Sequence, residues 1–131
     1  MTAQTPPDDS APLVLVVDDS KILLHFVKKT LVEAGMRVIT TDNPITVPSL
    51  IREHNPSLML VDVEMPGLEG PKVVQIIGDR ASMKIFLHST RPTSELARLV
   101  RESGADGYIP KSKDGETLAR KLWTVYEQMS T

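Results

Sequence analysis

The segment LMLVDVEMPG, residues 58–67, runs four apolar residues directly into an acid, and a Pro-Gly pair follows. A continuous apolar run of this length predicts a strand that is buried on both faces, as in a parallel sheet. An ionised carboxylate at the end of such a strand costs free energy unless another group compensates it. Asp62 therefore raises the question of which groups elsewhere in the chain stabilise its charge.

The composition is that of one ordinary globular domain. The chain has 131 residues, of which 40% are apolar and 24% are charged, with no cysteine and a net charge of −2. These values suit a single hydrophobic core, exclude disulfides and argue against a direct attraction to nucleic acid. No apolar run is long enough to span a membrane, and the first residues lack the features of a signal peptide. We therefore expect a cytoplasmic protein without membrane contacts.

Strand patterns and helix patterns alternate along the chain. Strands are expected at 13–17, 36–40, 58–62, 84–89 and 107–110, and helices at 21–34, 47–54, 94–103 and 114–129 with a short one after residue 71. Five strands alternating with five helices predict an α/β fold, a doubly wound five-stranded parallel sheet in the flavodoxin-like order 2-1-3-4-5. The proline-rich residues 1–11 are expected to form a flexible tail before one domain at 12–131.

Local signals refine these elements. Asp19 or Ser20 is expected to cap the first helix, and Gly35 to end it. The expected buried stripe of this helix consists of Ile22, Leu23, Phe26, Val27, Thr30, Leu31 and Ala34. Pro48 delays the start of the second helix to Val47 or Pro48. A loop is expected at Pro66, Gly67, Gly70 and Pro71.

Polar side chains converge on one edge of the predicted sheet. In a sheet of this order, ligands bind at the carboxyl ends of the strands, where the order reverses between the first and third strands. These two strands end at Asp18-Asp19 and at Asp62. Two carboxylates at about 4 Å repel by roughly 4 kcal/mol at an effective dielectric of ~20. Mg²⁺ and the ammonium of Lys111 would offset this repulsion, and Ser89 adds a hydroxyl, a set that suits attack of a carboxylate on a phosphoryl group.

The chain resembles the receiver domains of two-component response regulators, in particular single-domain regulators of the chemotaxis type. The resemblance lies in LVVDDS (15–20), LVDVEMPG (60–67), Ser89-Thr90 and GADGYIPK (104–111). It covers nearly the whole chain. Each motif is a common short string, but their order and their places at strand ends make them specific together.

The resemblance implies a role for each acidic residue and for the lysine. Asp62 would be the phosphoacceptor, which takes phosphate from a phosphohistidine of a histidine kinase or a histidine phosphotransfer protein. Asp19 would ligate Mg²⁺ directly, Asp18 would act largely through a water, and the backbone carbonyl of Glu64 would complete the metal shell. Lys111 would pair with the phosphoryl oxygens. The protein would catalyse only its own phosphorylation and dephosphorylation.

The resemblance also implies a conformational switch. Ser89 and the small residue Thr90 would bind the phosphoryl group, and Tyr108 would swing inward as Ser89 moves. The surface of the fourth helix, fifth strand and fifth helix would then bind a downstream protein or a second copy of the chain. Glu64 and Arg91 occupy positions that tune the phosphate lifetime and would pair across the site. Ser112 stands where many relatives have proline, so the cis bond of those relatives cannot form here.

Alternative interpretations remain open. The chain could be a non-phosphorylated receiver-like adaptor, or the receiver fragment of a larger regulator, although we expect no covalent DNA-binding or enzymatic output domain after Met129. An aspartate-nucleophile phosphatase is disfavoured because it would have a second acid at the position of Ser20. A flavin-binding protein is disfavoured because Asp18 and Asp19 would repel the phosphate of the flavin. His25, His54 and His88 are expected to have surface or packing roles. Trp123 and Tyr126 cover the core edge or, as we favour, form a partner surface.

Overall fold

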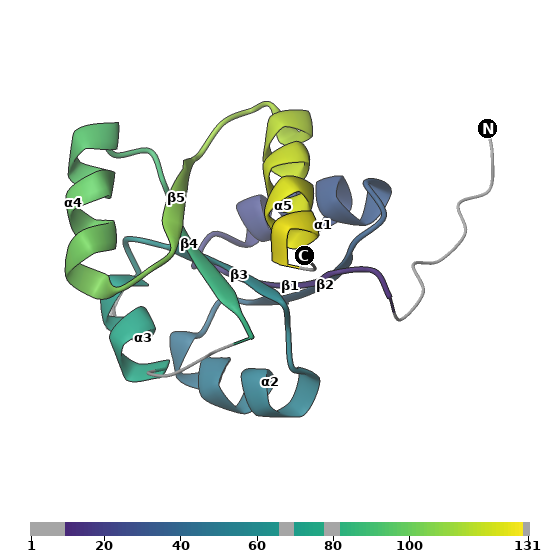
Figure 1. Ribbon diagram of the computed structural model, residues 1–131, viewed down its shortest axis with the longest axis horizontal. Coiled ribbons are helices and arrows are strands. Elements are labelled where there is room, and N and C mark those ends of the chain that lie inside the picture. The colour runs from purple at the N-terminus through teal and green to yellow at the C-terminus, as the bar shows by residue number, and fades with distance from the viewer. Residues whose placement is uncertain (1–9, 66–69, 78–81, 130–131) are drawn as a thin grey trace.

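A computed structural model describes residues 10–65, 70–77 and 82–129 of the chain (Figure 1). Its elements are β1 (Leu13–Val17), α1 (Lys21–Glu33), β2 (Arg37–Thr41), the 3₁₀ helix η1 (Pro44–Thr46), α2 (Val47–His54), β3 (Leu58–Asp62), α3 (Gly70–Ile77), β4 (Lys84–Ser89), α4 (Thr93–Ser103), β5 (Gly107–Pro110) and α5 (Gly115–Met129). The five strands form one parallel sheet in the order β2-β1-β3-β4-β5. The predicted fold class and strand order are therefore confirmed.

The sheet is covered on both faces, and its central strands are fully buried (Figure 1). Alternate residues of a strand point to opposite faces, so Leu15 and Met59 pack in the core under α2, α3 and α4. Val16 and Leu60 pack in the second core, under α1 and α5. This two-sided burial is what the continuous apolar runs predicted, and it fixes the strand ends at a common edge.

The predicted helix ends at α1 and α2 are confirmed in detail. The N–H of Leu23 donates to the Ser20 hydroxyl at 3.2 Å, which identifies Ser20 as the cap of α1. Gly35 follows the helix with a φ of +92°, a left-handed conformation that favours glycine. Pro48 lies in the first turn of α2, where a missing N–H costs nothing. Asn43 caps the 3₁₀ turn that precedes this helix.

The predicted face of α1 is partly wrong. Leu24, Val27 and Leu31 are its buried residues, whereas Ile22 is 86% exposed and Phe26 is 38% exposed. Successive residues of a helix are separated by about 100°, so a helix that buries position 24 turns position 22 to the opposite side. The apolar spacing fitted more than one face, and packing against the sheet selected the face of Leu24.

Smaller differences concern element boundaries. β2 begins at Arg37, one residue later than predicted, because Arg37 pairs with Leu13 and the fully buried Met36 lies before the ladder. The loop prediction is wrong for Gly70 and Pro71, which begin α3. Pro66 and Gly67 lie outside the described residues.

The aromatic residues of α5 also have structural contacts. Trp123 Nε1 donates to the carbonyl of Ala34 at 2.8 Å, and the side chain packs against the core under α1. The hydroxyl of Tyr126 donates to the carbonyl of Ser10 at 2.9 Å. These contacts favour the edge-of-core interpretation over a free partner surface.

Candidate functional site

Three carboxylates meet at the carboxyl ends of the two central strands. Asp18 and Asp19 follow β1, and Asp62 is the last residue of the neighbouring β3. One oxygen from each of the three lies within 4.8 Å of the others. Asp18 and Asp62 are buried, whereas Asp19 is exposed. The convergence predicted from the strand order is thus present in the structure.

Lys111 lies directly against this acidic cluster. Its Nζ is 3.0 Å from Asp18 Oδ2 and 3.1 Å from Asp62 Oδ1. The backbone N–H of Lys111 donates to the carbonyl of Ser89 at 2.8 Å, which holds the segment after β5 against the end of β4. None of the described peptide bonds is cis. Lys111 therefore reaches both buried acids with a trans bond to Ser112, without the cis bond to proline that many relatives have at this point.

The electrostatics of the site favour additional positive charge. Burial and then the charge of Asp18 raise the pKa of Asp62, and Lys111 and the backbone N–H of Glu64 offset this only in part. Burial lowers the pKa of Lys111, but Asp18 and Asp62 together outweigh burial and raise it. One ammonium thus does not neutralise the negative charge of the cluster, and Lys111 stays protonated.

The donor set fits a hard divalent cation. The N–H of Ser20 donates to Asp18 Oδ1 at 2.9 Å and so orients this carboxylate. Asp18 Oδ2 is buried and, beyond its ion pair with Lys111, accepts no well-directed hydrogen bond among the described residues. Carboxylate oxygens supplemented by water are the ligands that Mg²⁺ prefers. Asp18, Asp19 and Asp62 could therefore hold this ion.

Ser89, at the end of β4, presents a hydroxyl on the same edge of the sheet. Its side chain is buried, and its Oγ accepts a hydrogen bond from the N–H of Arg91 at 3.0 Å. Because this contact uses Oγ as an acceptor, the hydroxyl hydrogen remains available to a phosphoryl oxygen. Thr90, which follows it, is exposed.

Arg91 links the loops that follow β3 and β4. Its Nε is 2.8 Å from Glu64 Oε1, and its Nη1 is 2.9 Å from Glu95 Oε1 in the first turn of α4. The predicted pairing of Glu64 with Arg91 is confirmed. Glu95 was missed, although its spacing of four residues from Arg91 along a helix start was the signal that could have identified it.

Gly70 is a second residue that sequence reasoning missed. A Cβ atom at this position would lie only 2.0 Å from the backbone carbonyl oxygen of Asp62. The N–H of Gly70 also donates to the carbonyl of Val63 at 3.0 Å. The start of α3 therefore packs on the backbone that carries the central carboxylate, and only glycine allows this approach.

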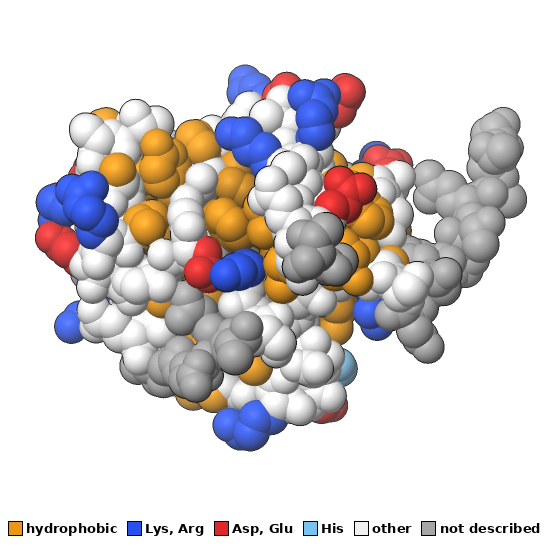
Figure 2. All heavy atoms as spheres, viewed as in Figure 1, with side chains coloured by type: hydrophobic (Ala, Val, Ile, Leu, Met, Phe, Trp, Pro, Cys, Tyr) orange, Lys and Arg blue, Asp and Glu red, His pale blue; other side chains and the backbone are white. Residues whose placement is uncertain are grey.

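Tyr108 lies on β5, paired in register with Leu87 of β4. It is half-buried, and it lines a groove between β5 and α5 together with Phe86, Ile109 and Val125. Figure 2 shows apolar side chains gathered between α4 and α5, with basic side chains on both helices. The residue predicted as the switch therefore lies within an apolar part of the surface.

With this geometry in place, comparison with known proteins defines the class. The family model for the response regulator receiver domain matches residues 14–122. The chain belongs to this family, the receiver domains of two-component response regulators.

Individual relatives agree with this assignment. The chain is 29% identical over 112 residues to the transcriptional regulatory protein CseB of Streptomyces avermitilis, which covers 86% of this chain and 48% of CseB. It is 30% identical over 112 residues to the transcriptional regulatory protein TctD of Salmonella typhimurium, which covers 83% of this chain and 49% of TctD. The chain thus spans about half the length of these curated relatives.

A solved structure extends the similarity to the fold. The chemotaxis protein CheY4 of Vibrio cholerae superposes with a TM-score of 0.81 at 26% identity, over 88% of this chain and 99% of CheY4. Separately, none of the described helices has the length and apolar character needed to cross a lipid bilayer.

Proposed function

We propose that this chain is the phosphoacceptor of a two-component system or phosphorelay, with Asp62 as the phosphorylated residue. The observation that carries the proposal is the position of Lys111, whose ammonium lies between Asp62 and Asp18 at 3.1 and 3.0 Å. A cation held at this place can stabilise the negative charge of a phosphoryl group on Asp62. Family membership supports the same role.

The proposed reaction is the transfer of one phosphoryl group. An oxygen of Asp62 attacks phosphorus, and the P–N bond to a donor histidine breaks with its electron pair returning to the imidazole. Lys111 Nζ, 3.1 Å from Asp62 Oδ1, favours the ionised form of this carboxylate, which is the form that attacks. The phosphoryl oxygens then face Lys111 and Ser89.

Mg²⁺ is the proposed cofactor. Asp18, Asp19 and Asp62 would hold it, with the backbone carbonyl of Glu64 as a further ligand, and the ion would supply charge stabilisation to the transferring phosphoryl group. The proposal rests on the three clustered carboxylates and on the buried Asp18 Oδ2, which lacks a well-directed hydrogen bond among the described residues.

The proposed donor is a histidine kinase or a histidine phosphotransfer protein, as for receiver domains generally. Two of the exposed apolar side chains are Ile22 in the first turn of α1, which is 86% exposed and lies three residues after Asp19, and Ile45 in η1, which is 80% exposed. Apolar exposure beside a charged site is a feature of protein contact surfaces.

The proposed output uses the surface of α4, β5 and α5. Movement of Ser89 toward the phosphoryl group would break its contact with the N–H of Arg91 and change the space available to Tyr108. The apolar surface between α4 and α5 (Figure 2) would then bind a downstream protein or, alternatively, a second copy of the chain. Glu64 and Arg91, paired at 2.8 Å, would set the phosphate lifetime by controlling access to Asp62.

A non-phosphorylated adaptor is the competing proposal, but no contact of the described residues favours it. A receiver segment of a larger regulator is compatible with the site, since the curated relatives are about twice as long as their matched part.

Phosphorylation by small donors tests the proposal. Incubation with Mg²⁺ and either acetyl phosphate or phosphoramidate, whose P–N bond resembles that of phosphohistidine, should add one phosphoryl group by intact-mass analysis. Asp62→Asn should abolish the addition, and the matched variant Asp42→Asn, at an exposed acid outside the cluster, should retain it. Labelling of Asp62→Asn at the parental level would refute the assignment.

A further inference from the structure

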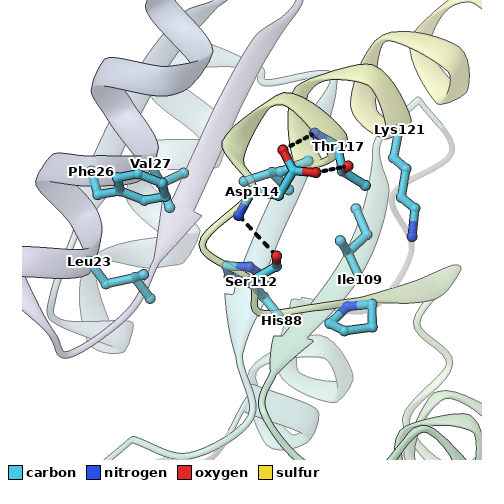
Figure 3. A pocket seen from close by; sticks show the side chains of 11 residues that line it. Leu23, Phe26, Val27, His88, Ile109, Ser112, Asp114, Thr117 and Lys121 are labelled. Carbon is cyan, nitrogen blue, oxygen red and sulfur yellow. Dashed lines mark hydrogen bonds between the residues drawn. The ribbon is translucent and has the colours of Figure 1, made fainter.

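A cavity lies on the face of the sheet opposite the α2–α4 core, between α1 and α5 and above the ends of β4 and β5 (Figure 3). Its volume is about 120 Å³. Leu23 and Val27 of α1, with Ile109 and Leu118, make its walls largely apolar. Figure 3 shows the α1 side chains on one side and the start of α5 on the other. No site described above uses this space.

His88 is the unusual residue of the cavity lining. It is only 4% exposed, and its ring has no hydrogen-bond partner among the described residues. Burial and then the charge of Lys111 lower the pKa of His88 to about 4. The imidazole is therefore neutral at physiological pH and offers one N–H donor and one acceptor nitrogen to whatever enters the cavity.

Three polar residues at the rim, Ser112, Asp114 and Thr117, are hydrogen-bonded to one another. The N–H of Asp114 donates to Ser112 Oγ at 2.9 Å, and the N–H of Thr117 donates to Asp114 Oδ1 at 3.2 Å. The hydroxyl of Thr117 donates to Asp114 Oδ2 (Figure 3). These bonds turn the three groups toward each other, so His88 inside the cavity and Lys121 at its rim are left to hydrogen-bond an occupant.

We propose that this cavity is a binding site for a small, uncharged and largely apolar molecule that carries one hydrogen-bonding group, of the size and chemistry of phenol. The apolar walls favour a ring or short hydrocarbon, and His88 selects one hydroxyl or amine on it. A buried apolar cavity of about 150 Å³ is known to accept benzene, so the volume is of the right order for a cavity that is open on one side. Asp114 and Lys121, of opposite charge at the rim, give no preference for an ion of either sign.

The cavity is lined by residues that are adjacent in the chain to residues of the candidate phosphorylation site. His88 precedes Ser89 in β4, and Pro110 and Ser112 flank Lys111, so three lining residues are chain neighbours of two groups proposed to contact the phosphoryl group. The N–H of Lys111 also donates to the carbonyl of Ser89. Displacement of Ser89 or Lys111 therefore moves the cavity wall. Resting on the proposed function, we infer that an occupant and phosphorylation influence each other reciprocally.

Phenol, with benzene as the matched ligand that lacks the hydroxyl, tests the binding site. Titration of the metal-free protein, followed by NMR of methyl and imidazole groups, should give saturable shifts concentrated at His88, Val27 and Leu118. His88→Leu should reduce the preference for phenol over benzene by about fivefold, the loss of one hydrogen bond. His54→Leu, the same change at an exposed histidine, should retain the preference.

The proposal would be overturned by scattered or non-saturable shifts, or by a preference for phenol over benzene in His88→Leu as large as in the parent. Ordinary water would then be the occupant of the cavity. Val27→Phe, which fills the cavity from α1, provides an independent check: phenol shifts should vanish while the melting transition stays cooperative. Persistent phenol binding in this variant would place the ligand elsewhere and refute the site.

Beryllium fluoride with Mg²⁺, a mimic of the phosphorylated state, tests the coupling. The affinity for phenol should change severalfold when the mimic is bound. An unchanged affinity would refute the coupling and leave the cavity as an independent site. Failure of the mimic to shift signals around Asp62 would refute the proposed function, and the phenol titration of the metal-free protein would still decide the cavity.

Discussion

Replacing Asp62 by asparagine should stabilise the metal-free protein while abolishing its proposed function. The oxygens of Asp18 and Asp62 lie within 4.8 Å of each other, which corresponds to a repulsion of roughly 3 kcal/mol at an effective dielectric of ~20. Lys111 offsets part of this, yet the pKa of Asp62 remains raised, first through burial and then through Asp18. The charged form of Asp62 is thus held against a net penalty, which neutral asparagine removes. We expect a gain on the order of 1 kcal/mol in the free energy of unfolding, or roughly 3–5 °C in Tm.

The assay is thermal or urea unfolding at neutral pH, with EDTA and with Mg²⁺. The parent should be stabilised by Mg²⁺, by about 1.4 kcal/mol at ten times the Kd, because the ion binds the folded state. Asp62→Asn should start higher in EDTA and respond far less to Mg²⁺, while Asp42→Asn should follow the parent. A variant that is less stable than the parent in EDTA, or that gains equally from Mg²⁺, would refute the electrostatic reasoning.

Three further predictions concern residues around the site. Arg91→Ala removes the link between the loops that follow β3 and β4, and it should shorten the phosphate lifetime severalfold with little effect on stability. Arg98→Ala is the control. An unchanged decay rate of phosphorylated Arg91→Ala would contradict a role of Arg91 in setting this lifetime. His88 is buried with a pKa of about 4 against an ordinary value of 6.5, so the unfolded chain binds the proton first. The contribution of neutral His88 to the free energy of unfolding should be fully present above pH 6.5, and about 3 kcal/mol of it should be lost as the pH falls to 4. His88→Leu should flatten this slope in urea unfolding, and an identical slope would exclude His88 as its source. Gly70→Ala places a methyl group against the Asp62 carbonyl and should cost about 1–3 kcal/mol and slow labelling by acetyl phosphate; parental stability and labelling would show that α3 moves aside freely.

The parts of the fold that could be predicted are those encoded by local pattern. The continuous apolar runs that end at Val17 and Val61 indicated strands buried on both faces, and such strands occur in parallel sheets. The alternation of elements then limited the topology, and the topology brought Asp18, Asp62 and Lys111 to one edge. For this reason the acid–lysine arrangement was accessible from the sequence before any distance was known.

The features that could not be predicted depend on tertiary packing. The spacing of apolar residues in α1 fitted more than one face, and only the sheet selected Leu24 over Ile22. Nothing in the local sequence at Gly70 specifies its approach to the Asp62 carbonyl, because the contact joins two separate elements. His88 likewise carries no local signal of its cavity, since its neighbours there come from α1, β5, α5 and the segment before α5.

The central claim is that the acidic cluster and Lys111 form the receiving site for a phosphoryl group on Asp62. A crystal structure determined with Mg²⁺ and beryllium fluoride tests this most directly. The account predicts the fluoride group bound to an Asp62 oxygen, within hydrogen-bond distance of Lys111 Nζ and Ser89 Oγ, with Mg²⁺ beside it on the carboxylates of Asp18 and Asp19. A bare Asp62 side chain under saturating ligand, or the Asp18–Asp19 pair turned into solvent, would contradict it.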